Sequence, residues 1–255
     1  MKIKFVLSAI YIFVFSVTNG FAQIDANQIF SEANESYKNG DYAKATELYE
    51  QLLSNKYESA VVYYNLGNTY FKQSKIPNSI LNYERARILD PSDEDILFNL
   101  RVANLQTIDK IEPIGKFFLY ELKDAIVDYF SSQTLALYAT ILSFLAFGLL
   151  TLYFYTWKPF VKKLTFSFSV LFFVLMISSI LFAQNKYNKE QAHDSAIIFM
   201  SSVYVKSSPD AGGTDLFILH DGTKVTILDA LGDWKKIRLE DGKVGWAPVQ
   251  ALQII

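Results

Sequence analysis

The chain has 255 residues, of which 51% are hydrophobic and 16% aromatic, and its formal net charge is −2. Such an apolar composition excludes a disordered chain, and the near-neutral charge gives no indication of a nucleic-acid partner. The sequence contains no cysteine, which excludes disulfides, a thiolate nucleophile and zinc sites built on thiolates.

Residues 1–22 have the three-part pattern of a secretory signal peptide. Lys2 and Lys4 precede an uncharged stretch, and Gly20 and Ala22 are the small residues that a cut after Ala22 requires. An uncleaved membrane helix is the alternative. Both interpretations deliver the next segment to the outer side of the membrane.

Residues 23–110 contain an internal repeat. Gly67 stands 34 residues after Ala33, and Tyr83 stands 34 residues after Tyr49. Small residues allow two helices to approach closely, and aromatic rings fill the space between them. This period and these residue types resemble the tetratricopeptide repeat, an α-helical unit that stacks into a solenoid.

The resemblance implies a binding groove, because the first helix of each tetratricopeptide unit lines a concave face that suits an extended peptide or a partner's helix. Residues 93–110 look like a capping helix at the end of the solenoid. The alternative for Tyr37 and Phe71 is packing against that capping helix. The residues predicted to bind a partner in the groove are Phe30, Asn34, Tyr37, Lys38, Tyr64, Asn65, Asn68, Phe71 and Lys72.

Residues 111–132 begin with a helix breaker made of Pro113 and Gly115 and continue as interleaved apolar and charged residues. This mixture predicts an amphipathic juxtamembrane segment in the membrane interface. A last helix packed on the repeats is the alternative.

Two apolar runs predict a transmembrane hairpin. Residues 133–157 and 164–183 contain no charged residue, and about 20 helical residues span the roughly 30 Å of a bilayer core. The link between them, 158–163, carries three lysines and no acid. Short basic loops stay in the cytoplasm, so we expect an inner-membrane protein whose flanking domains face the periplasm.

Residues 184–195 read as a polar linker, and residues 196–255 change to a β pattern. Short apolar runs separated by Asp-Gly and Gly-Asp turns predict a small all-β barrel. The predicted strands lie at 197–205, 216–219, 225–228, 234–239 and 244–249.

Details of this segment resemble a bacterial SH3-like domain. The first strand ends in Lys206, Ser207, Ser208 and Pro209, where that family usually has Arg-Ser-Gly-Pro. Later in the segment, Gly232 and Asp233 precede Trp234, and Gly245 precedes Trp246. Trp234 and Trp246 are the binding residues that we predict for this domain.

Little in the sequence points to catalysis. The two histidines, His193 and His220, fall in different contexts and have no cysteine partner, and there is no Gly-rich phosphate loop. The acidic run from Asp93 to Asp95 stands at a predicted helix start, where negative charge is favourable. The sequence therefore predicts a protein that is not an enzyme and has no metal and no cofactor.

The order of signal peptide, helical repeats, membrane hairpin and SH3-like domain describes a multi-domain protein that resembles the BatE family of the Bacteroides aerotolerance operon. The stretch from Asp95 to Ala103 fits that family too. The resemblance implies partners among membrane-anchored von Willebrand factor A proteins and a role in envelope or oxidative stress tolerance. We expect a non-catalytic periplasmic adaptor; the alternative is a cell-wall-sensing or wall-anchoring regulator that binds peptidoglycan through its SH3-like domain.

Overall fold

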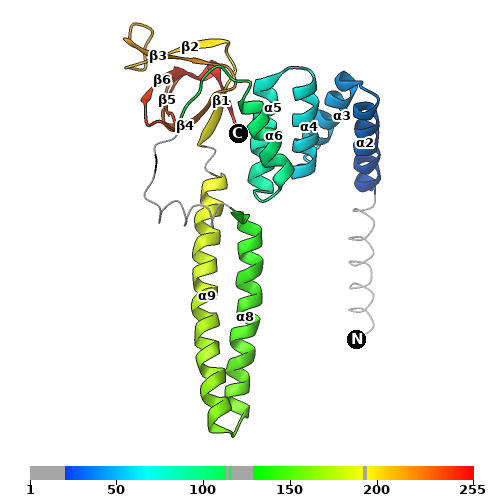
Figure 1. Cartoon of the computed structure of the whole chain (residues 1–255), viewed down its shortest axis with the longest axis vertical. Helices are drawn as coiled ribbons and strands as arrows, with labels where there is room; N and C mark the ends of the chain where they lie inside the picture. Colours follow the sequence, from blue (N-terminus) through cyan, green and yellow to red (C-terminus); the bar gives the residue numbers. More distant parts are fainter. Residues whose placement is uncertain (1–20, 113–114, 116–128, 192–193) are drawn as a thin grey trace, which may run out of the picture.

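The computed structural model describes residues 21–112, 115, 129–191 and 194–255 (Figure 1). Nearly all of the predicted signal peptide, most of the predicted juxtamembrane segment and His193 lie outside these residues. The described chain consists of a group of short helices, a seven-stranded sheet beside it, and a long two-helix hairpin that extends away from both (Figure 1).

The short helices follow one another closely along the chain, and each packs on the next. Three of these helices have capped starts: Asp41, Ser59 and Asp93 each accept a hydrogen bond from a backbone N–H in the first turn of the following helix. The helices are α2 (Phe21–Lys38), α3 (Tyr42–Ser54), α4 (Ala60–Lys72), α5 (Ile76–Leu89) and α6 (Glu94–Asn104).

The residues that define the 34-residue period lie where these helices cross. Ala33 is fully buried, and the rings of Tyr49 and Tyr83 are each only 1% exposed. A Cβ atom on Gly67 would lie 2.6 Å from Cδ1 of Tyr83, so α4 and α5 are in contact at this glycine. The repeat in the sequence thus corresponds to a repeated helix crossing.

The hairpin consists of α8 (Ser132–Tyr155) and α9 (Pro159–Gln191). Both helices are long and apolar enough to cross a membrane, and only 17% and 11% of their most apolar windows are buried. They therefore differ from the core helices of a soluble protein. Two serines join them: Ser169 Oγ donates to the Ala146 carbonyl at 2.9 Å, and Ser179 Oγ donates to the Leu135 carbonyl at 2.8 Å.

The ends of α9 differ from our expectation. We expected a loop over 158–163 and a linker over 184–195, but the helix begins at Pro159 and continues to Gln191. Proline is favourable in a first helical turn because its missing N–H has no helical acceptor there. Lys162, in the first turns of α9, makes a cation–π contact with α8, since its Nζ lies 4.9 Å from the centre of the Tyr153 ring.

The sheet is antiparallel, with the strand order β3-β2-β6-β5-β4-β1-β7. We expected five strands, but the first predicted strand divides into two, because its first half pairs with β4 and β7 and its second half pairs with β3 and β6. A last strand was also missed. The strands are β1 (Ser195–Ile198), β2 (Ser202–Lys206), β3 (Asp215–His220), β4 (Lys224–Leu231), β5 (Trp234–Arg238), β6 (Val244–Pro248) and β7 (Leu252–Ile254).

The helices and the sheet share a hydrophobic cluster. Ile197 of β1 is fully buried in it together with Ile80 of α5, and Leu100 of α6 and the C-terminal Ile255 complete its centre. Beyond this cluster, Arg85 of α5 donates a hydrogen bond of 2.9 Å to the carbonyl of Ile254. The sheet is therefore packed directly on the end of the helical group.

Candidate functional site

Two networks of amide and phenol groups connect the helices along the predicted groove. In the first network, Asn34 Oδ1 accepts hydrogen bonds from Tyr49 Oη at 2.7 Å and from Asn65 Nδ2 at 3.1 Å. Each of these residues comes from a different helix, α2, α3 and α4. Side chains that we predicted as partner ligands thus also hold the helices together.

The second network repeats the first one 34 residues later. Asn68 Oδ1 accepts from Tyr83 Oη at 2.6 Å and from Asn99 Nδ2 at 2.8 Å. The Asn99 amide also donates to Tyr64 Oη at 3.0 Å. Burial raises the pKa of Tyr83, and it raises the pKa of Tyr49 to about 12, so both phenols keep their proton at any physiological pH.

A hollow of about 290 Å³ opens beside the second network. Five of the predicted groove residues line it: Tyr37, Tyr64, Asn68, Phe71 and Lys72. The sequence analysis missed the other members, which are Tyr83, Asn99 and Val102. The 34-residue period could have identified Asn99, because this residue stands 34 positions after Asn65.

Four predicted groove residues do not line this hollow: Phe30, Asn34, Lys38 and Asn65. Phe30 contacts the ring of Tyr49 edge-on, with the ring centres 6.2 Å apart. Lys38 is exposed in the last turn of α2, and Lys72, which does line the hollow, is exposed in the last turn of α4. The hollow is therefore lined by aromatic and amide groups and by the exposed Lys72, whereas Lys38 stands in solvent outside its lining; we call Lys38 and Lys72 the rim lysines.

The alternative that Tyr37 and Phe71 serve packing is supported in part, although their contacts are not with a capping helix alone. Tyr37 packs on the core formed by α2, α3 and α4, and its ring meets Tyr42 edge-on at 5.4 Å. Phe71 packs on the cluster that the helices share with the sheet. Both rings are half-buried, so each combines a packing contact with a surface that lines the hollow.

Trp234 and Trp246 lie on one face of the sheet. Trp234 pairs with Pro248, and Lys236 pairs with Trp246, which makes the two indoles diagonal neighbours across β5 and β6. The strand residues that alternate with them, such as Ile237 and Ala247, form the buried core. The indoles are therefore half-buried on the outer face of the sheet, beside a lysine.

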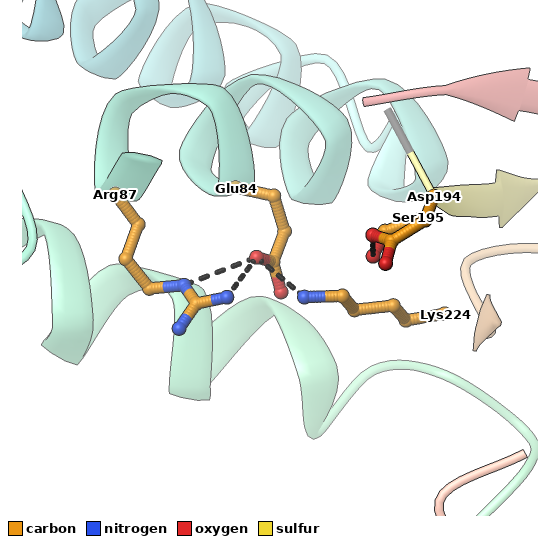
Figure 2. A network of polar contacts seen from close by, with 5 residues as sticks. All are labelled: Glu84, Arg87, Asp194, Ser195 and Lys224. Carbon is orange, nitrogen blue, oxygen red and sulfur yellow. Dashed lines mark hydrogen bonds and ion pairs between the residues drawn. The ribbon is translucent and has the colours of Figure 1, made fainter. Parts of the chain in front are cut away.

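An ion pair that the sequence did not reveal connects the helices to the sheet. Glu84 of α5 is buried and binds Lys224 Nζ of β4 at 2.8 Å and Arg87 at 2.7 Å. Figure 2 shows the two cations reaching the carboxylate from opposite sides. Burial raises the pKa of Glu84, but the charges and hydrogen bonds of Lys224 and Arg87 outweigh burial and lower it.

Asp109 makes a second polar connection, between the segment that follows α6 and the turn between β3 and β4. Its carboxylate accepts hydrogen bonds from the His220 backbone N–H at 2.7 Å and from Thr223 Oγ1 at 2.6 Å, and it lies 2.8 Å from His220 Nδ1. Burial raises the pKa of Asp109, yet these hydrogen bonds and the His220 charge lower it overall. His220 thus serves the interface between helices and sheet.

Within the described part of the chain, no group of three or more His, Asp or Glu residues is arranged to hold a metal ion. Residues 201–253 match the bacterial SH3 domain family, and this match covers β2 to β7 of the sheet. No curated protein matches the sequence.

Proposed function

We propose that the protein is a non-catalytic, membrane-anchored adaptor that binds a protein partner in the groove of its helical part. The observation that carries this proposal is the hollow beside the Asn68 network, where aromatic rings and amides from α2, α4, α5 and α6 surround an open volume. Its amide and phenol groups hydrogen-bond to one another, so the surface is already ordered before a partner binds. Binding then costs less conformational entropy.

The chemistry of the rim favours an acidic or polar partner segment, because Lys38 and Lys72 stand in solvent at equivalent places one repeat apart. We further propose that the helical part is a tetratricopeptide repeat domain and that the adaptor works in a Bat-type envelope complex. Its partners there would be von Willebrand factor A membrane proteins on the periplasmic side of the inner membrane. The order of the parts along the chain supports this assignment.

The groove is tested by replacing Lys38 and Lys72 with glutamate. Capture of partner proteins from solubilised membranes should weaken through reversed charge, most strongly at low salt, where screening is least. Folding should change little, since exposed substitutions usually alter stability by about 0.5 kcal/mol or less. The matched control is Lys44→Glu with Arg101→Glu, which makes the same charge change at exposed positions that neither line the hollow nor belong to the predicted groove. Equal capture by the groove variant and its parent would eliminate the groove as the recognition surface.

The second candidate function is binding of peptidoglycan by the sheet, and the bacterial SH3 match together with the two neighbouring indoles on its outer face favours it. The full chain should then sediment with purified peptidoglycan, and Trp246→Ala should abolish this without lowering capture through the groove. Trp157→Ala is the matched control, because Trp157 is 96% exposed at the far end of the hairpin. Sedimentation that persists in Trp246→Ala would argue against this role.

The membrane arrangement is tested with single cysteines, which is simple because the chain has none of its own. We propose that the sheet faces the periplasm and that the basic turn region of the hairpin faces the cytoplasm. A cysteine at Ser208 should react with an impermeant reagent in cells with a permeabilised outer membrane, whereas one at Val161 should not. The reverse pattern would contradict the envelope function.

A further inference from the structure

Two adjoining cavities lie at the end of the hairpin that is nearest the helices and the sheet. The first is a groove of about 520 Å³ along α8 and α9. The second, of about 840 Å³, lies between the hairpin end, α5 and the last strand of the sheet. Ser132, Gln133 and Tyr187 line both cavities, so the two adjoin at these residues and are treated together as one candidate site.

The groove between α8 and α9 offers contacts for hydrocarbon. Two of its hydroxyl groups are satisfied within α8, because Thr140 Oγ1 donates to the Ala136 carbonyl at 3.0 Å and Ser143 Oγ donates to the Thr140 carbonyl at 2.7 Å. Met176 and Ile180 of α9 form the opposite wall. From Ser132 to Ser143 the helix rises about 16 Å, which is roughly half of a bilayer core and matches the depth of one leaflet.

The second cavity has the features of a headgroup site. It adjoins the point where the candidate membrane spans end, at Ser132 on α8 and near Tyr187 on α9. Arg85 and Glu58 line it, together with apolar residues such as Leu89. The Arg85 guanidinium lies 5.9 Å from the centre of the Tyr63 ring and donates to the Ile254 carbonyl, so it is held at the wall of the cavity.

We propose that this site binds one phospholipid with an ethanolamine headgroup. An acyl chain lies in the groove, the phosphate binds Arg85 and the ammonium group binds Glu58. Among the described residues, the charged side chains that line the headgroup cavity are one cation, Arg85, and one carboxylate, Glu58. They can pair with both charges of a zwitterionic headgroup, whereas an anionic headgroup would meet the carboxylate as well as the cation. This inference rests on the membrane anchoring that we propose for the hairpin, and it is independent of the adaptor role.

The test measures which lipid stays with the purified full chain. The protein is placed in vesicles of equal phosphatidylethanolamine and phosphatidylglycerol, extracted in mild detergent and assayed for bound lipid by mass spectrometry. We expect phosphatidylethanolamine to be enriched. Arg85→Gln and Ala136→Phe should each reduce its retention about tenfold, equivalent to about 1.4 kcal/mol, and Glu58→Gln should shift the preference toward phosphatidylglycerol.

Two matched controls lie outside both cavities: Arg101→Gln on α6 and Leu137→Phe on α8 should retain lipid as the parent does. Ala136→Phe keeps the test decisive if Arg85→Gln disturbs the strand that ends at Ile254. Equal retention of both lipids, or unchanged retention in Ala136→Phe, would overturn the lipid site while leaving the anchor intact. A chain that fractionates away from membranes would overturn the anchor, and the site with it.

Discussion

Individual residues in the groove combine two tasks. Asn34 and Asn68 each accept two hydrogen bonds: one comes from a tyrosine of the same repeat, and the other comes from an asparagine of the next repeat. Each network joins three helices, so a substitution within it affects stability as well as recognition. The rim lysines are separate from these networks, and for this reason they distinguish binding from folding.

At Gly67, even the addition of a single methyl group should lower the stability of the helical part. In Gly67→Ala the new Cβ would lie 2.6 Å from the buried Tyr83 ring, so α4 and α5 must move apart. We expect a loss of about 1 to 3 kcal/mol in the free energy of unfolding, measured by urea denaturation. Gly115→Ala is the control, because a Cβ added there would meet no atom within 4 Å. An unchanged midpoint for Gly67→Ala would show that the helix crossing is looser than this contact implies.

Asp109 should make stability depend on pH on the acid side. Its pKa is lowered in the folded state, so its contribution is complete above its unfolded pKa of about 3.9 and is lost as the pH falls through the folded value. Asp109→Asn should therefore cost about 1 to 3 kcal/mol at pH 7 and much less near pH 2. Urea midpoints across this range test the prediction, and the exposed Glu47→Gln is the control. A constant difference between parent and variant at all pH values would contradict it.

At the scale of elements, the contact between α5 and the sheet determines how the sheet docks on the helices. Helix α5 packs on β1 through Ile80 and Ile197, and its Glu84 binds Lys224 of β4. A buried carboxylate is costly unless it is paired, and here two cations pair it. The pairing also restricts how the sheet can dock, since a shifted sheet would leave the carboxylate with Arg87 alone.

A double-mutant cycle on Glu84 and Lys224 should reveal this coupling. We expect Glu84→Gln and Lys224→Met to interact by about 0.5 to 3 kcal/mol in the free energy of unfolding. The same cycle on Asp241 and Lys243, whose lysine side chain is 63% exposed, should give about 1 kcal/mol or less. Additive effects at Glu84 and Lys224 would mean that the ion pair does not help to dock the sheet.

At the scale of the whole molecule, the helices and the sheet form one packed unit beside the hairpin (Figure 1). Their shared cluster contains residues from α5, α6, β1 and the C-terminus. The groove and the outer face with Trp234 and Trp246 consequently belong to parts of the chain that are in direct contact. A partner bound in the groove and a ligand on the sheet would therefore bind to one packed unit.

This arrangement predicts that the helices and the sheet unfold together. Ile197→Ala removes a fully buried side chain from the shared cluster and should cost about 2 to 5 kcal/mol. The backbone amides of α5, as well as those of the sheet, should then be less protected from hydrogen exchange. Tyr204→Ala, at a side chain that is 52% exposed on β2, serves as the control and should change protection in neither. Loss confined to the sheet would show two independent domains.

Local patterns in the sequence were sufficient for much of this description. The small and aromatic residues at 34-residue spacing predicted the helix crossings at Ala33 and Gly67, because side-chain size limits how closely helices approach. Charge-free runs predicted the two long helices, and alternating residues with glycine turns predicted most strands of the sheet. These features depend only on neighbouring residues and on the period of each element.

Contacts between distant segments were decided by the tertiary structure alone. The sequence marks Glu84 as one more helix carboxylate, and its partner Lys224 stands 140 positions away. The division of the first predicted strand into β1 and β2 depends on which strands receive its two halves. Ile197 and Ile255 belong to one hydrophobic cluster with residues of α5 and α6, and the sequence around them does not indicate this. Pairing across such separations depends on how complete elements dock, and a periodicity within one segment carries no information about it.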